Sequence, residues 1–134
     1  MQTANNKEYG AASIEELYRL RTDSDEIRCH RLKVRNEKAG ELLFTVTEKE
    51  KKLNIEEVFI EKIYRRQGLG NMLMRYAEET ASVLGLKAVV VRPFSTDPAI
   101  SDLQLREWYG KRGYMVTGQR MLKKIKATNM EVTS

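Results

Sequence analysis

The chain has 134 residues and a formal charge of +5, because 24 lysine and arginine residues outnumber 19 aspartate and glutamate residues. This length suits one domain with a core of its own and leaves no room for a second one. A single cysteine, Cys29, excludes an internal disulfide, and a single histidine, His30, leaves no zinc-binding set. No apolar run approaches the roughly 20 residues of a membrane span, and no signal-peptide core lies near the start. We therefore expect one soluble cytoplasmic domain over residues 1–134, with no bound metal and no membrane partner.

The first half of the chain predicts an antiparallel meander behind a short helix. Residues 1–12 show no apolar period and are interpreted as a loose leader. Residues 13–22 begin with Ser-Ile-Glu-Glu, a capping-box pattern, and carry apolar residues on one helical face, which predicts a helix. The next apolar segment changes phase near His30, which indicates a bulge in a strand. The strands expected in this half span residues 26–35, 41–47 and 53–60.

The second half predicts two helices that alternate with strands. Apolar residues recur at helical spacing over residues 69–84, and Gly85 follows where a left-handed cap is expected. Residues 88–91 read Ala-Val-Val-Val, as in a central strand that runs parallel to its neighbour and is covered on both faces. Residues 101–104, Ser-Asp-Leu-Gln, are a second capping box and begin a helix that ends near Arg112. The remaining segments are interpreted as a loop at residues 92–100, a last strand at 114–124 and a disordered tail at 126–134.

Residues 65–70, Arg-Arg-Gln-Gly-Leu-Gly, connect a strand to a helix in a way that suits an anion. Gly68 and Gly70 let the backbone approach a ligand without an intervening Cβ atom, and the first N–H groups of a helix have no intrahelical partner. These donors, the positive end of the helix dipole and the side chains of Arg65 and Arg66 favour a pyrophosphate. The spacing matches neither the Walker nor the Rossmann pattern, which argues against nucleotide hydrolysis. The alternative is a glycine-containing turn with solvated arginines.

Two motifs can be compared with those of known families. Residues 59–70 read Phe-Ile-Glu-Lys-Ile-Tyr-Arg-Arg-Gln-Gly-Leu-Gly, and residues 108–114 read Trp-Tyr-Gly-Lys-Arg-Gly-Tyr. The first resembles the strand, acetyl-CoA loop and helix start of the GNAT superfamily of acetyl-CoA-dependent N-acetyltransferases. The second is similar to the helix-ending Leu-Tyr-x-Lys-x-Gly-Phe signature of that family. The motifs occur in the family's order, and the resemblance covers about residues 53–125.

The resemblance implies an α/β (α+β) fold with a mixed, mostly antiparallel twisted sheet, a central splay and flanking helices. It also implies acetyl-CoA as the acetyl donor, with the pantetheine arm between the strand ending at Ile60 and the strand at residues 88–91. Backbone N–H groups of residues 66–70 would bind the pyrophosphate, and an N–H near Ile60 would polarise the thioester carbonyl. The cofactor-binding residues that it implies are Phe59, Ile60, Arg65, Arg66, Gln67, Gly68, Leu69, Gly70, Asp102 and Tyr109.

The resemblance further implies catalytic residues. Tyr109 matches the family's tyrosine that protonates the leaving thiolate, and a phenol suits this role because its ordinary pKa of about 10 exceeds the roughly 8.5 of a thiol. Glu56 or Glu57 would take a proton from the amine, and strand alternation lets at most one of them face the cleft. Glu56 matches the family position better. Alternatively, both glutamates are solvated and Tyr109 only packs beside Trp108, while His30 is a further candidate base.

The chain departs from the family pattern in three places. Asp102 and Leu105 stand where many members carry asparagine and a small residue. The loop at residues 92–100 is longer than usual and could form a cleft wall or an ordinary surface loop. The region before residue 25 is short for the family, so we expect one amino-terminal element to be missing or reduced.

Together these observations favour transfer of an acetyl group from acetyl-CoA to a primary amine by direct attack on the thioester. The acceptor can be a small molecule or a protein. The alternative is a module that binds acetyl-CoA or CoA without turnover. Nucleic-acid binding through residues 111–112 and 123–126 is not favoured, because no nucleic-acid motif accompanies these charges. The exposed last strand offers an edge for a homodimer, and a monomer is equally compatible with the sequence.

Overall fold

The structure is a computed structural model that describes residues 6–95 and 97–126. Its strands are β1 (Asn6–Tyr9), β2 (Ala12–Arg21), β3 (Asp25–Val34), β4 (Glu37–Thr47), β5 (Lys52–Ile60), β6 (Ala88–Val91), β7 (Met115–Thr117) and β8 (Arg120–Lys124). Its helices are the 3-10 helix η1 (Lys62–Tyr64) and the α-helices α1 (Leu69–Val83) and α2 (Asp102–Gly110).

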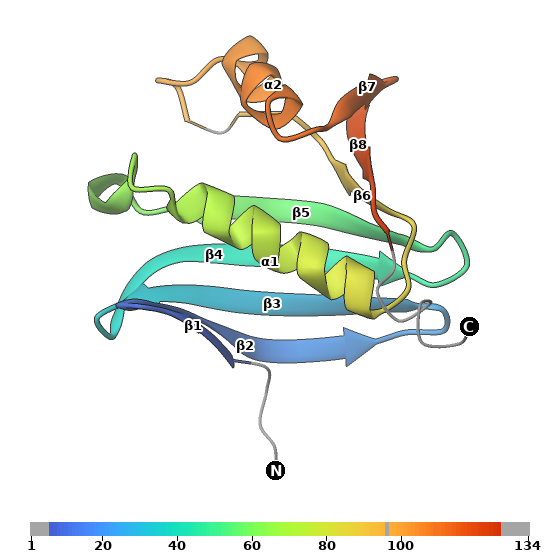
Figure 1. Ribbon diagram of the computed structural model, residues 1–134, viewed down its shortest axis with the longest axis horizontal. Coiled ribbons are helices and arrows are strands. Elements are labelled where there is room, and N and C mark those ends of the chain that lie inside the picture. The colour runs from blue at the N-terminus through green and yellow to red at the C-terminus, as the bar shows by residue number, and fades with distance from the viewer. Residues whose placement is uncertain (1–5, 96, 127–134) are drawn as a thin grey trace.

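All strands belong to one sheet, in the order β1-β2-β3-β4-β5-β6-β8-β7. Neighbouring strands are antiparallel except for β5 and β6, which are parallel and are joined through α1. Helix α1 lies across one face of the sheet, and α2 lies near β7 at the far side of β6 (Figure 1). The predicted fold class, a mixed and mostly antiparallel sheet flanked by helices, is confirmed.

The predicted helix at residues 13–22 is wrong, because this segment is strand β2. Its side chains alternate, with Ala12 and Ile14 buried and their neighbours less so, which is the period of a strand. The strand pairs with β1 on one side and β3 on the other, and its register shifts between Glu16 and Tyr18. This bulge moves the later apolar residues out of phase, so they mimic a helical stripe in the sequence.

Strand β1 also corrects the interpretation of residues 1–12 as a loose leader. Residues 6–9 pair with β2 from Asn6↔Glu15 to Tyr9↔Ala12, while residues 1–5 lie outside the described part of the chain. The described residues ahead of β5 contain strands and no helix. That an amino-terminal element of the family is missing or reduced stays a prediction.

Strand β3 alternates without the bulge that was predicted near His30. Its buried positions are Glu26, Arg28, His30 and Leu32, so three polar side chains share one buried face with Leu32. Arg28 donates to Glu26 through Nε at 2.7 Å, which compensates both buried charges. The irregularities lie in the partner strands instead, in β2 beside Glu16 and in β4 opposite Leu32.

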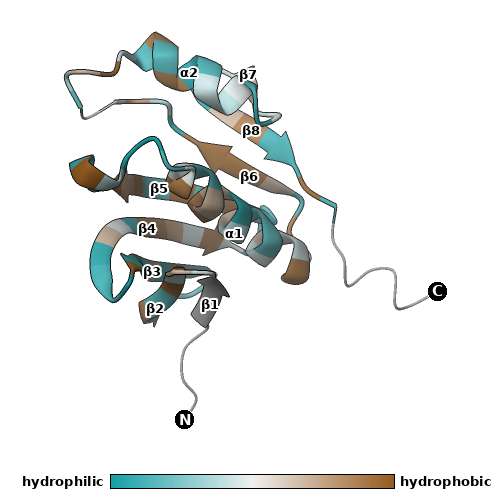
Figure 2. Ribbon diagram, turned by 60° about the vertical axis from the view of Figure 1, so that its left-hand side comes forward, coloured by the Kyte–Doolittle hydropathy of each residue, from teal (hydrophilic) through white to brown (hydrophobic). Residues whose placement is uncertain are grey.

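Helix α1 is confirmed in place and in the face that it buries. Its buried residues include Leu73 and Ala77, and Leu86 N–H bonds back to the Ala81 carbonyl after Gly85, whose φ is 75°. The core between this helix and the sheet continues into β6, which is hydrophobic along its whole length (Figure 2). Of the helices that the structure describes, none has the length and apolar character needed to cross a membrane.

The carboxyl-terminal segment forms a hairpin rather than the single strand predicted at residues 114–124. Strands β7 and β8 pair through Thr117↔Arg120, and Gly118 takes a φ of 69° in the two-residue turn between them. Strand β7 is an edge of the sheet, with Met115 and Val116 exposed. A dimer through this edge stays a prediction, and the tail predicted at residues 126–134 lies outside the described residues from 127 onward.

Candidate functional site

The central splay of the sheet is confirmed between β5 and β6. The two strands pair only from Lys52↔Ala88 to Asn54↔Val90. Beyond Asn54, the side of β5 that faces β6 has no strand partner among the described residues. Strand β5 also bulges at Glu56, because Glu57 pairs with Leu43 whereas Ile55 pairs with the next residue of β4. Unpaired strand groups next to a bulge can bind an extended ligand in place of a neighbouring strand.

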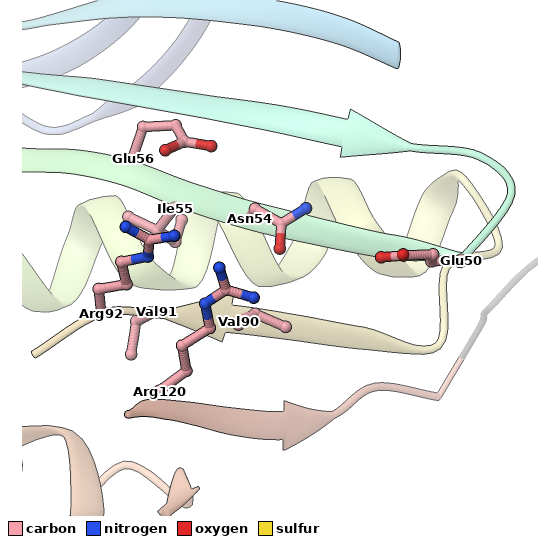
Figure 3. Close-up of a pocket in the computed structure, with 8 residues that line it drawn as sticks. All are labelled: Glu50, Asn54, Ile55, Glu56, Val90, Val91, Arg92 and Arg120. Atoms are coloured by element: carbon pink, nitrogen blue, oxygen red, sulfur yellow. The ribbon is translucent and has the colours of Figure 1, made fainter. Parts of the chain in front are cut away.

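A cleft of about 210 Å³ opens where the two strands separate. Leu53 and Val89 lie in the core beneath α1, and Asn54 and Val90 point to the other face, so the cleft opens away from that helix (Figure 3). The cleft is lined by Glu50, Asn54, Ile55, Glu56, Val90, Val91, Arg92 and Arg120. Its polar side chains therefore come from β5, β8, the turn before β5 and the residue that follows β6.

The two candidate bases occupy different positions relative to this cleft. Glu56 lines it, whereas Glu57 is not among the lining residues, and both side chains are exposed. Only one of the two glutamates therefore faces the cleft, as strand alternation implied, although Glu56 is also the extra residue of the bulge. Glu56 as the general base stays a prediction, and its placement is compatible with that role.

The loop before α1 leaves backbone donors exposed at the helix start. Gly68 is the N-cap with a φ of 78°, and no side chain caps this helix. The first helical hydrogen bond runs from Met72 N–H to the Gly68 carbonyl, so the N–H groups of Leu69 and Gly70 point out of the helix without an intrahelical acceptor. Arg66 also adopts a positive φ, 65°, in the turn. This geometry is typical of an anion-binding helix start.

The two arginines of this loop differ in their contacts. Arg65 donates through Nε to the Ile60 carbonyl at 2.9 Å and forms an ion pair with Asp97. The N–H of Ala99 and the Arg65 charge together hold the pKa of Asp97 below its usual range. Arg65 therefore ties Asp97 to the end of β5. Arg66 is exposed and has no hydrogen bond or ion pair with another described residue.

The two sequence motifs meet in the structure. The ring of Trp108 covers Gly70, since a Cβ atom added there would lie 3.5 Å from Cζ2 of the indole. Arg112 stacks on that indole at 3.6 Å from the ring centroid and donates through Nε to Asn71 Oδ1 at 2.5 Å. The end of α2 is thereby held against the start of α1, which fixes the position of Tyr109.

Tyr109 is buried within an aromatic cluster. Its ring meets those of Trp108 and Tyr114 edge to face, at centroid distances of 5.1 and 5.6 Å. Burial raises the pKa of Tyr109 to about 12, although the Arg112 charge acts in the opposite direction. The phenol therefore keeps its proton at neutral pH and can donate a hydrogen bond to a thiolate. Its role as the acid stays a prediction.

Two other candidate site residues, His30 and Asp102, make contacts within the fold. His30 is fully buried, bonds through Nδ1 to the Leu42 carbonyl at 3.2 Å and packs against Phe44 and Tyr76. It does not line the cleft, and this position does not suit a base for an amine. Asp102 accepts from Ser95 N–H at 2.8 Å, so its carboxylate ties the preceding loop to the first turn of α2.

The basic segments that suggested nucleic acid also contact the protein itself. Lys123 pairs with Glu78 at 3.0 Å, and Arg112 stacks on Trp108 as described above. Within the described ranges, no group of three or more histidine, cysteine, aspartate or glutamate side chains could hold a metal ion.

Sequence reasoning missed the arginines of the cleft. Arg92 directly follows the buried strand β6, and ligands often bind at the carboxyl ends of parallel strands, so its position was a usable signal. Arg120 reaches the cleft only because β8 folds back beside β6 through the hairpin at Gly118. Gly118, inside the segment predicted as one strand, was the sequence signal for that hairpin.

The chain matches the family model described as the acetyltransferase (GNAT) family over residues 1–114. Among solved structures, it is similar to the paia N-acetyltransferase from Thermoplasma acidophilum in complex with coenzyme A, with a TM-score of 0.58 and 16% identity over 73% of this chain and 60% of that one. It is also similar to nourseothricin acetyltransferase, with a TM-score of 0.61 and 18% identity over 73% of this chain and 65% of that one. The chain thus spans less than two thirds of the length of both.

The match to one shorter solved structure covers a larger share of that structure. The anti-CRISPR protein AcrVA5 has a TM-score of 0.54 and 24% identity, over 63% of this chain and 88% of that one. At these identities the three structures show a common fold. A comparison with curated proteins finds no match.

Proposed function

Because the chain belongs to the acetyltransferase (GNAT) family, we propose that it transfers an acetyl group from acetyl-CoA to a primary amine. The observation that carries this proposal is the continuity of the splay with the uncapped start of α1. Strand β5 leaves its pairing with β6 at Asn54 and ends at Ile60, and the loop with Gly68 follows directly. One extended ligand with an anionic group at one end fits this path.

On the donor side, the pyrophosphate of acetyl-CoA binds the N–H groups at the start of α1 together with Arg66. The pantetheine amides pair with the free groups of β5. The bound coenzyme A of the paia N-acetyltransferase structure supports the use of this cofactor. Arg65 acts indirectly, by holding Asp97 against the end of β5.

In the reaction, the lone pair of the neutral amine attacks the carbonyl carbon of the thioester. The new C–N bond forms and the C–S bond breaks. Glu56, directly or through water, takes the proton that the amine loses, and Tyr109 donates a hydrogen bond or a proton to the departing thiolate. A backbone N–H of β5 near the bulge stabilises the developing oxyanion.

The second candidate is a module that binds acetyl-CoA or CoA without turnover. The raised pKa of Tyr109, about 12, favours this alternative, because a phenol of that pKa gives its proton to a thiolate less readily.

The experiment that tests the proposal is a calorimetric titration with acetyl-CoA, followed by thiol release with a panel of amines. Gly70→Glu places a carboxylate at the helix start and is expected to abolish micromolar binding. Gly70→Ala is the matched control, because the added Cβ makes only an ordinary contact with Trp108. Binding without thiol release for any amine would favour the module, and no binding by the folded wild type would contradict both candidates.

A further inference from the structure

The cleft at the splay is lined by charges of both signs on opposite walls. Arg92 and Arg120 extend toward β5 from the β6 and β8 side, while Glu56 lies on the β4 side of β5 (Figure 3). Glu50 lines the same cleft from the turn before β5. None of these four side chains forms an ion pair with any residue that the structure describes.

The two arginines have no ion-pair partner within the described residues, although Glu50 and Glu56 line the same cleft. Elsewhere the cations that contact other parts of the fold have partners, as Arg65 has Asp97 and Lys123 has Glu78. Two guanidinium groups that converge on one cleft repel each other, and an anion between them relieves this repulsion. Their planar donor geometry fits the oxygens of a carboxylate or a phosphate.

The arginines lie far from the part of the fold that suits the phosphates of acetyl-CoA. Strands β5 and β6 pair around Asn54, whereas the loop with Gly68 follows the other end of β5, after Ile60. The register of β6 with β5 and β8, continued as far as residue 92, places Arg92 and Arg120 beside Glu56. Glu56 is separated from Ile60 by roughly 13 Å along an extended strand. The anion bound by the arginines therefore belongs to the other substrate.

A second cavity, of about 330 Å³, continues from the cleft and shares both arginines with it. Phe94 gives this cavity an apolar wall, with 54% of its surface exposed, and Thr117 and Gln119 add polar groups. An anion held by Arg92 and Arg120 would thus lie between the two cavities. One side faces Glu56 and the splay, and the other leaves room for the rest of the acceptor.

We propose that the acetyl acceptor is a primary amine that carries its own anionic group, a carboxylate or a phosphate. Arg92 and Arg120 bind the anion, and the amine lies on the Glu56 side of the cleft, where the bulge of β5 borders the splay. This inference rests on the proposed acetyl transfer, and it names the chemical class of the acceptor.

The test compares amines that differ only in the anion. Calorimetric titrations use 4-aminobutyrate against 4-aminobutyramide and O-phosphoethanolamine against ethanolamine, with the full chain both free and saturated with CoA. We expect the anionic member of at least one pair to bind about 10- to 100-fold more tightly, as charge-assisted hydrogen bonds to two arginines imply. The two pairs separate a carboxylate from a phosphate.

Substitutions of the two arginines test whether the preference for the anionic amine arises in the cleft. Arg92→Gln and Arg120→Gln are each expected to reduce the ratio of affinities for the anionic and the neutral amine at least ten-fold. Both should leave the Kd of acetyl-CoA unchanged. Arg75→Gln, on the exposed side of α1, is the matched control and should change neither value. Thermal unfolding of each variant checks that it folds.

Several results would overturn the inference. Equal affinity for both members of each pair, or no binding of any amine, contradicts an anion site for the acceptor. A weaker Kd for acetyl-CoA in the Arg92 and Arg120 variants would mean that the arginines serve the cofactor. If acetyl-CoA binds and amines are acetylated without this preference, the inference fails and the proposed function stands. If acetyl-CoA does not bind while the preference persists, the proposed function fails and the anion site stands.

Discussion

The strands β1–β4 and the segment from β5 to α2 differ in how completely their strands pair and in whether certain polar groups have partners. Strands β2, β3 and β4 are each paired on both sides, and the buried Arg28 and Glu26 of β3 bond to each other. In the second region, β5 and β6 separate after Asn54, the start of α1 has no side-chain cap, and the cleft arginines have no ion partner among the described residues. The Arg28–Glu26 pair thus supports the fold of the first region, whereas the unpaired part of β5, the start of α1 and the cleft arginines remain available to a ligand.

This difference predicts whether a substitution should change the free energy of unfolding or the binding of a ligand. Side chains of the first region are expected to affect the free energy of unfolding and to leave ligand binding alone. Side chains that face the splay are expected to affect binding or rate with little effect on stability.

The substitution Tyr109→Phe is expected to have the largest effect, a decrease in the turnover number kcat. The ring stays in its aromatic cluster, so only the hydroxyl is lost, and we expect kcat to fall about 10²- to 10⁴-fold if this hydroxyl acts as the acid. Because the pKa of Tyr109 is about 12, the wild-type rate should show no decline from ionisation of this phenol up to pH 10. Steady-state kinetics with saturating acetyl-CoA measure both.

Tyr114→Phe is the matched control for this prediction. The Tyr114 hydroxyl donates to Glu78 at 2.8 Å within the fold, so its loss should lower stability by about 1–3 kcal/mol and leave kcat within a few-fold of wild type. Equal losses of kcat in the two variants would contradict a specific role for Tyr109. Unchanged kcat in Tyr109→Phe would favour the non-catalytic alternative.

The next effect is on stability at acid pH and originates at His30. Burial lowers the pKa of His30 from its ordinary 6.5 to about 4. Between these values the unfolded chain binds a proton that the folded chain does not, so stability is complete above pH 6.5 and decreases as the pH falls toward 4. The pKa difference corresponds to a loss of about 3 kcal/mol at pH 4, measured by urea unfolding at a series of pH values.

His30→Asn removes this titration and keeps an N–H donor for the Leu42 carbonyl. Its absolute stability is expected to be lower, but its stability should depend less on pH between 6.5 and 4 than that of the wild type. Carboxylates of lowered pKa, such as Asp97, contribute in both proteins and cancel in the comparison. Equal pH dependence in both proteins would contradict the prediction.

The smallest effect distinguishes two stretches with the same local pattern. Ser101 caps α2 by accepting from Gln104 N–H at 3.0 Å, so Ser101→Ala should cost about 1 kcal/mol. Ser13 begins an identical pattern but lies in β2, between Glu8 of β1 and Lys33 of β3, so Ser13→Ala should change stability by less than about 0.5 kcal/mol. Chemical denaturation of the two variants measures both, and equal losses would contradict the difference.

These two stretches also show how far the sequence predicted the fold. The capping box at residues 101–104 is formed in full, whereas residues 13–16 are part of a strand. Local hydrogen bonds decide the structure at Ser101, because a loop precedes it and no strand competes. At Ser13, two neighbouring strands offer ladder partners, and these outweigh the helix pattern.

In the candidate site, predictions made from contiguous motifs and those that needed distant segments had different outcomes. The glycines at 68 and 70 lie at the helix start as expected, and Tyr109 lies at the end of α2. The sequence did not indicate that Arg65 contacts Asp97, that Glu56 is a bulge residue, or that Arg120 lines the same cleft as Arg92. Each of these depends on which segments become neighbours.

By itself, the sequence determined the elements whose signals are local. Helix α1, the buried strand β6, the glycine loop and the capping box of α2 follow from periodicity, burial and backbone freedom within a few residues. The tertiary structure alone decided that residues 13–21 extend as a strand, that polar residues of β3 are buried and that charges of opposite sign line one cleft. The physical reason is that strand pairing and charge convergence join residues far apart in the chain, and their free energy appears only once those residues meet.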